Sequence, residues 1–105
     1  MTIAPLDSLD ERIRRAIAEK RLLELRYKRA VRLAEPPDYG VIDGTERLLI
    51  FQLRGPDSGH GAVGWRLLDV AKIDNCVVTD QTFAGSRGQS HQQHYQWDTL
   101  YARVS

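Results

Sequence analysis

Residues 64–73 read GWRLLDVAKI, and this stretch decides the fold that we expect. Side chains alternate between the two faces of a β-strand. One face would carry Trp65, Leu67, Ala71 and Ile73, and the other would carry Arg66, Leu68, Val70 and Lys72. A strand that is apolar on both faces is usually covered on both, here by the interior of a barrel and by a helix. Arg66 and Lys72 would then share one face, and what they meet there is the main functional question.

The chain is long enough for a single domain, residues 1–105, that buries a core without disulfides or metals. The apolar share of 42% and the charged share of 28% are ordinary for a soluble globular protein. A net charge of +1 gives no general electrostatic reason to bind nucleic acid or a membrane. Residues 1–32, however, hold nine of the 15 Lys and Arg residues and five of the 14 Asp and Glu residues. This excess predicts either a basic face or, more simply, a solvated helix.

Cys76 is the only cysteine, which excludes an internal disulfide and fits a reducing compartment. It is followed by Val77 and Val78, so we expect a small buried hydrophobic residue rather than a nucleophile. The first residues, MTIAPLDSLDERIRR, contain no apolar signal segment, and no run approaches the ~18 apolar residues of a membrane span. We therefore expect a cytoplasmic protein without a membrane segment.

The N-terminal part has the pattern of one amphipathic helix. Ser8 and Glu11 have the spacing of a capping box, which predicts that the helix runs over about residues 8–20. The apolar side chains on its inner face would be Leu9, Ile13, Ala16 and Ile17.

The remainder, about residues 22–104, has the pattern of antiparallel strands. Apolar and charged residues alternate over 23–27, and residues 31–35 return as a second strand that Pro36-Pro37 should stop. Residues 36–46 are expected to form an irregular link with a turn at Asp43-Gly44. Residues 47–53 are apolar on both faces and should be a central strand, and a glycine-rich connection follows over 54–64.

Two further strands complete the expected fold. Asp74-Asn75 should end the stretch quoted first, before a short strand over 76–79, and residues 99–104 alternate as a terminal strand. The fold class is therefore α+β, mostly β: a small antiparallel barrel of five to six strands with one N-terminal helix. The residues expected to be largely buried are Ile13, Ile17, Leu25, Ile50, Leu68, Val70 and Val77.

Signals of catalysis or metal binding are weak. His91 and His94 are three residues apart and could share a metal on a helix, but no Cys or acidic partner lies at a recognised spacing. A polar loop over residues 85–94, the least ordered internal segment, is the simpler interpretation. His60 lies among glycines without an evident partner. We therefore expect no enzyme, no cofactor and no metal site, and a hydrolase using His60 or His91 ranks third among the functions considered.

A recognition surface is the stronger hypothesis. Guanidinium groups bind carboxylate or phosphate bidentately, and aromatic rings stack on bases or other flat groups. The residues that could form such a surface are Tyr27, Arg32, Trp65, Arg66 and Tyr101. The alternative is that the two aromatic residues Tyr27 and Trp65 belong to the core and that the arginines lie at its rim.

The order of several residues resembles a stand-alone WYL-type domain, a group of small bacterial proteins that lack an attached helix-turn-helix. The resemblance covers about residues 17–104. It rests on Tyr27, Arg32 with Glu35-Pro36, the strand from Leu48 to Gln52, Trp65-Arg66 with Lys72-Ile73, and Phe83 followed by Tyr95. The Trp-Tyr-Leu for which the family is named would fall near residues 48–50, which are aliphatic here.

This resemblance implies an SH3-like or Sm-like barrel with a helix beside it, and a regulatory, non-enzymatic module. The family is associated with ligand sensing, often of a nucleotide or nucleic acid, in transcription regulation or phage defence. A ligand groove carried over by position would use Arg32, Arg66 and Lys72 with Gln52 nearby, and Tyr27 belongs to the same set. The expected ligand is a small anion, a nucleotide or single-stranded nucleic acid. The alternative is a structural module that binds another protein or forms a homodimer through sheet edges.

Overall fold

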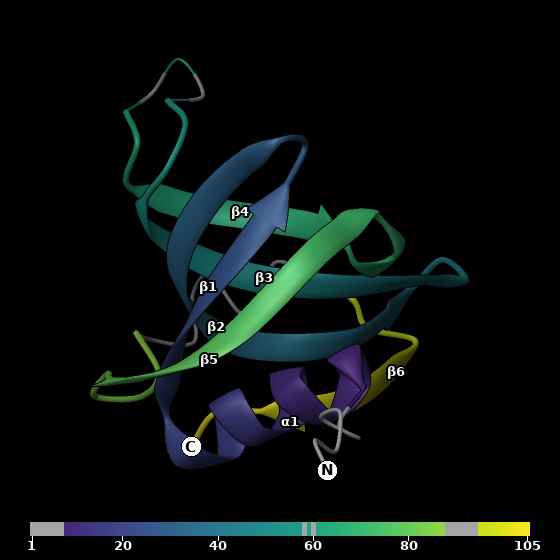
Figure 1. Cartoon of the computed structure of the whole chain (residues 1–105). Coiled ribbons are helices and arrows are strands. Elements are labelled where there is room, and N and C mark those ends of the chain that lie inside the picture. Colours follow the sequence, from purple (N-terminus) through teal and green to yellow (C-terminus); the bar gives the residue numbers. More distant parts are fainter. Residues whose placement is uncertain (1–7, 58, 60, 88–94) are drawn as a thin grey trace, which may run out of the picture.

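The computed structural model describes residues 8–57, 59, 61–87 and 95–105, so His60, His91, His94 and most of the predicted loop 85–94 lie outside the described residues. The elements follow in the order α1 (Leu9–Glu19), β1 (Arg21–Tyr27), β2 (Ala30–Ile42), β3 (Thr45–Arg54), β4 (Gly64–Asp69), the 3-10 turn η1 (Val70–Lys72), β5 (Ile73–Thr82) and β6 (Thr99–Arg103). The predicted class is confirmed: the fold is mostly β with an N-terminal helix (Figure 1).

The strands form one antiparallel sheet in the order β4-β3-β2-β1-β5, and β6 pairs with the second half of β2. Figure 1 shows β2 bending strongly, so that its first half lies beside β1 and its second half beside β6. Among the described strands, no ladder joins β4 to β5. The predicted closed barrel is therefore wrong. The sheet is curled but open, because η1 leads the chain from β4 across to the far side of β1, where β5 pairs.

The sequence predicts that Pro36 and Pro37 end the second strand, but β2 continues through both of them. The register with β3 shifts between Glu35 and Asp38, so the ladder does not need the N–H groups that proline lacks. The prolines also lie where the other neighbour of β2 changes from β1, which pairs as far as Ala34, to β6, which pairs from Asp38. The irregular link predicted over residues 36–46 is therefore wrong.

The turn predicted at Asp43-Gly44 is confirmed. It joins β2 directly to β3, and the register pairs Ile42 with Thr45. Both turn residues have positive φ, 50° for Asp43 and 76° for Gly44, as a two-residue hairpin requires.

The stretch 64–73 is not one strand. β4 ends at Asp69, whose side chain accepts a hydrogen bond from the Ala71 amide (3.1 Å) and so caps η1. The Asp69 amide in turn donates to the hydroxyl of Tyr27 at 3.1 Å. Arg66 and Lys72 therefore do not share a strand face. The sequence predicts that Asp74 and Asn75 separate two strands, but both residues lie inside β5.

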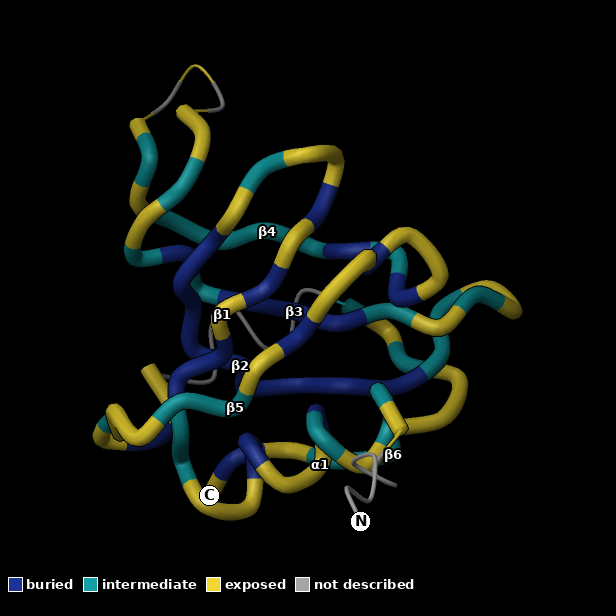
Figure 2. The backbone as a smooth tube through the Cα atoms, in the orientation of Figure 1, coloured by how far each residue is buried: buried dark blue, intermediate teal, exposed yellow. Residues whose placement is uncertain are grey.

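The core lies between the helix and the concave face of the sheet. The capping box of α1 is formed, and Ile13, Ala16 and Ile17 face the sheet. Figure 2 shows the buried backbone concentrated in β1, β2 and β3. Of the predicted core residues, Val77 alone is wrong: it is 46% exposed, because Cys76 beside it points inward at 2% exposure. The confirmed ones are Ile13, Ile17, Leu25, Ile50, Leu68 and Val70.

Candidate binding site

A hollow of about 230 Å³ is lined in part by residues of the β1–β2 hairpin. Figure 1 shows the tip of this hairpin at the end of the sheet away from α1. We call this hollow the cationic hollow. Its lining residues are Tyr27, Lys28, Arg32, Pro56, Asp57, Arg66, Leu67 and Leu68. They come from the β1–β2 hairpin, from β4 and from the connection between β3 and β4.

Strand register explains why polar side chains reach this end of the core face. Residues that lie opposite each other in antiparallel strands point to the same side of the sheet. Arg32 lies opposite Leu25, which is 1% exposed, and Arg66 lies opposite Ile50, which is 0% exposed. Both arginines therefore point to the concave face, although the helix covers only its other end.

Gln52 lies behind the cationic hollow and is fully buried, at 0% exposure. Its Oε1 accepts a hydrogen bond from Arg32 Nη1 at 2.9 Å. Its Nε2 donates to the carbonyl oxygens of Pro56 (3.0 Å) and Ala62 (2.6 Å). Gln52 thus joins Arg32 to both ends of the glycine-rich connection. It holds the site together from behind and does not line the hollow.

Arg32 is a buried cation with an unused donor. The residue is 9% exposed, and its Nε has no hydrogen-bond partner among the described residues. Burial lowers the pKa of Arg32, and the positive charge of nearby Arg66 lowers it further. The Tyr27 ring, whose centroid is 5.3 Å from the guanidinium carbon, gives partial compensation.

Arg66 is the second cation of the hollow, and it donates to backbone carbonyls, those of Trp65 (2.9 Å) and Gly61 (3.0 Å). Within the described part of the chain, neither Arg32 nor Arg66 forms a salt bridge with an acidic residue. Asp57 also lines the hollow, but its Oδ1 accepts from the amides of Gly59 (2.8 Å) and Gly61. Two arginines are thus held close together with one carboxylate at the rim.

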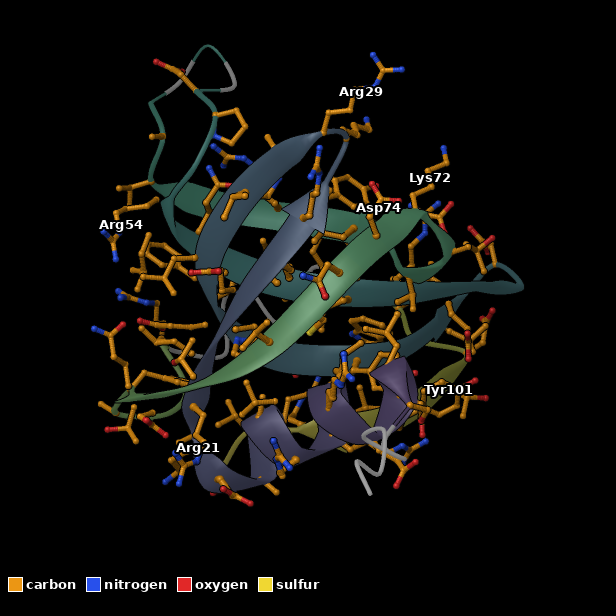
Figure 3. All side chains as sticks on the ribbon, viewed as in Figure 1. Arg21, Arg29, Arg54, Lys72, Asp74 and Tyr101 are labelled. Carbon is orange, nitrogen blue, oxygen red and sulfur yellow. The ribbon has the colours of Figure 1, made fainter. Side chains whose placement is uncertain are left out.

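Lys28, and not Lys72, is the third cation of this region. Its Nζ lies 5.7 Å from the centroid of the Tyr27 ring, at the exposed turn between β1 and β2. Lys72 is on η1 beside Asp74 (Figure 3) and does not line the hollow. The sequence carries a local signal for Lys28, because a two-residue turn directly after Tyr27 places residue 28 at the rim.

The other two members of the predicted recognition surface lie elsewhere. Trp65 packs edge-on against Phe51, with ring centroids 5.2 Å apart. Tyr101 lies beside α1 (Figure 3), 5.0 Å from the ring of Tyr39 and 4.9 Å from the guanidinium carbon of Arg14. The structure therefore brings together Tyr27, Arg32 and Arg66, with Gln52 behind them, and leaves out both Trp65 and Tyr101.

Signals for other kinds of site are few in the described ranges. These residues contain no group of three or more His, Cys, Asp or Glu side chains that could hold a metal ion. Cys76 is buried as predicted, and burial raises the pKa of its thiol to about 11. No helix in the described part of the chain is long and apolar enough to cross a membrane.

No family model, no curated protein and no solved structure matches this chain. Function therefore has to be inferred from the geometry of the cationic hollow.

Proposed function

We propose that this chain is a non-enzymatic binding module that takes a small anionic ligand, a nucleotide or a short nucleic-acid segment into the cationic hollow. The observation that carries the proposal is the pair Arg32 and Arg66, held close together with no acidic partner among the described residues. Their mutual repulsion is relieved when an anion binds between them. Guanidinium groups also suit the flat, paired oxygens of phosphate and carboxylate.

The resemblance to stand-alone WYL-type domains supports a regulatory role for this binding. Membership of that family, a role in transcription regulation and a cytoplasmic location are parts of the same proposal. So is the finer fold assignment, an SH3-like or Sm-like architecture, in an open form in which β4 and β5 do not pair with each other in the described part of the chain.

The test is a calorimetric titration with free nucleotides and short single-stranded oligonucleotides at low and moderate salt. We expect binding that weakens steeply with salt, because ionic contacts to phosphate do so. Arg66→Ala should abolish binding and leave thermal stability nearly unchanged, since Arg66 donates to carbonyl oxygens of residues that are partly or fully exposed. Lys72→Ala removes the same charge outside the hollow and is the matched control.

Two outcomes would contradict the proposal. One is that neither class of ligand binds the wild-type chain. The other is that Arg66→Ala lowers stability by several kcal/mol without any change in affinity, which would make Arg66 a structural residue.

A second candidate function is a structural module that binds another protein or a second copy of itself. The unpaired outer edges of β4 and β5 favour it, because such edges offer free backbone donors and acceptors to a partner strand.

A further inference from the structure

We propose that the cationic hollow receives a terminal phosphate group, so that the ligand is a phosphomonoester and not a phosphodiester inside a continuous strand. This inference rests on the proposed function and names the ligand class for the same site. Its grounds are the charge of the hollow, its small volume, and the Arg32 Nε, which has no partner among the described residues.

The charges favour a dianion. Among the described lining residues, Lys28, Arg32 and Arg66 bring three positive charges to the hollow, and Asp57 brings one negative charge. A phosphomonoester carries about −1.5 to −2 at neutral pH, whereas a phosphodiester linkage carries a single negative charge. The monoester is therefore the closer match to the excess of positive charge.

The inner wall of the hollow consists of buried residues. Tyr27 at 6%, Arg32 at 9% and Leu68 at 2% exposure line it, and the fully buried Ile50 lies on the same face of the sheet. The volume of about 230 Å³ is below the range of roughly 300–1,000 Å³ that encloses a whole drug-sized ligand. A terminal phosphate group fits such a small hollow, and the rest of the ligand then stays outside.

The contacts inside the hollow suit phosphate better than a base. Arg32 lines the hollow, and its Nε is buried without a partner among the described residues, so a phosphate oxygen bound beside it would satisfy this donor. The ring of Tyr27 already has the cationic groups of Arg32 (5.3 Å) and Lys28 (5.7 Å) near it. Because two cations already lie near this ring, we do not expect a base to stack on it. We therefore assign the phosphate, and not the base or sugar, to the interior of the hollow.

The experiment compares 5′-AMP with 3′,5′-cyclic AMP by calorimetry on the full chain. The two ligands share base and sugar, and only the first has a terminal phosphate. We expect 5′-AMP to bind about tenfold more tightly, as one additional charge contact would produce. Equal or tighter binding of cyclic AMP would overturn the inference and leave the proposed function standing. No binding of either nucleotide, of inorganic phosphate or of an oligonucleotide would overturn both.

A second pair of ligands identifies the source of the phosphate. A tetranucleotide with a 5′-phosphate should bind more tightly than the same tetranucleotide with a 5′-hydroxyl. If it also binds more tightly than 5′-AMP, the source is the end of a nucleic acid; if it does not, a free monoester is sufficient. Equal binding of the two tetranucleotides would contradict the requirement for a terminal group.

The NMR signal of the Arg32 Nε–H group reports on the interior and does not require a variant of a buried residue. It should shift when 5′-AMP is added, and Lys72→Ala should leave that shift intact. Arg66→Ala should abolish the binding of both 5′-AMP and inorganic phosphate, because one of the two guanidinium groups that hold the phosphate is then missing. If 5′-AMP binds while the Arg32 Nε–H signal stays unchanged, the phosphate lies elsewhere and the inference is wrong.

Discussion

At the scale of single residues, Gln52 is the uncharged side chain on which the cationic hollow depends. It is fully buried and makes three hydrogen bonds, one from Arg32 and two to the connection between β3 and β4. The sequence suggested that Gln52 lies near the ligand. The structure adds that it orients Arg32 from behind, because its side chain is shared between the arginine and the backbone of Pro56 and Ala62.

Gln52→Met keeps the length of the side chain and removes all three hydrogen bonds. We expect a loss of about 1–3 kcal/mol in the free energy of unfolding, because buried donors and acceptors lose their partners. We also expect weaker binding of 5′-AMP. Chemical denaturation and calorimetry measure the two effects.

Ile17→Val is the control for Gln52→Met, because it lowers stability by about 0.5–1.5 kcal/mol at the helix, away from the hollow. Binding of 5′-AMP by Ile17→Val should stay at the wild-type level. The same affinity in Gln52→Met as in wild type would show that Gln52 does not position Arg32.

At the scale of elements, α1 is fastened to the sheet through Tyr39 of β2. The Tyr39 hydroxyl donates to Asp10 Oδ1 at 2.7 Å, and Arg14 donates to both oxygens of the same carboxylate. The hydrogen bond from Tyr39 is the main cause that lowers the pKa of Asp10, and Arg14 adds to it. A carboxyl group with a lowered pKa stabilises the fold above its unfolded pKa, and this contribution is lost as the pH falls through the folded pKa.

Tyr39→Phe should therefore lower the free energy of unfolding by about 1 kcal/mol at pH 7. The difference from wild type should shrink as the pH falls through the folded pKa of Asp10, which lies below its ordinary value, because the carboxylate then becomes protonated. Thermal or urea denaturation across this pH range measures it. Tyr101→Phe removes an exposed hydrogen bond to Glu46 and should cost less than about 0.5 kcal/mol. A Tyr39→Phe effect that stays the same as the pH falls from 7 through the folded pKa of Asp10 would contradict the role of Asp10.

At the scale of the whole molecule, the open sheet raises the question of whether two copies of the chain associate through their sheet edges. Among the described strands, β4 and β5 each have one partner, and unpaired edges often pair with another chain. The edge of β5 is partly blocked at Cys76: its carbonyl oxygen accepts from Arg12 Nη1 (3.0 Å), and its amide donates to Asn75 Oδ1 (3.0 Å). β4 is therefore the better edge for a homodimer.

The homodimer stays a prediction of the sequence, and sedimentation velocity at micromolar concentration tests it. We expect a species with twice the 12.0 kDa mass of the chain. Particles of monomer mass alone would contradict the prediction and weaken the second candidate function with it.

The pattern of the sequence was sufficient for elements whose signals are local. The capping box of Ser8 and Glu11 marked the start of α1, and the Asp43-Gly44 turn marked a hairpin. Local signals were not sufficient where pairing partners decide the outcome. Cys76 and Val77 are adjacent in the sequence and both are apolar, so only the register with β1 determines which of the two side chains faces the core.

By itself, the sequence determined the class of the fold, which is one helix followed by antiparallel strands. The reason is that the spacing of apolar residues and the positions of turn residues are local properties of the sequence. The family resemblance in the sequence also predicted Tyr27, Arg32, Gln52, Arg66 and Lys72 as one group. The tertiary structure decided what these residues form. The end of β4 at Asp69 separates Lys72 from the group, and the curl of the sheet brings Arg66 of β4 to the β1–β2 hairpin, where Arg32 and Lys28 lie. Distances between strands depend on register and curvature, which arise only when the whole sheet packs around one core.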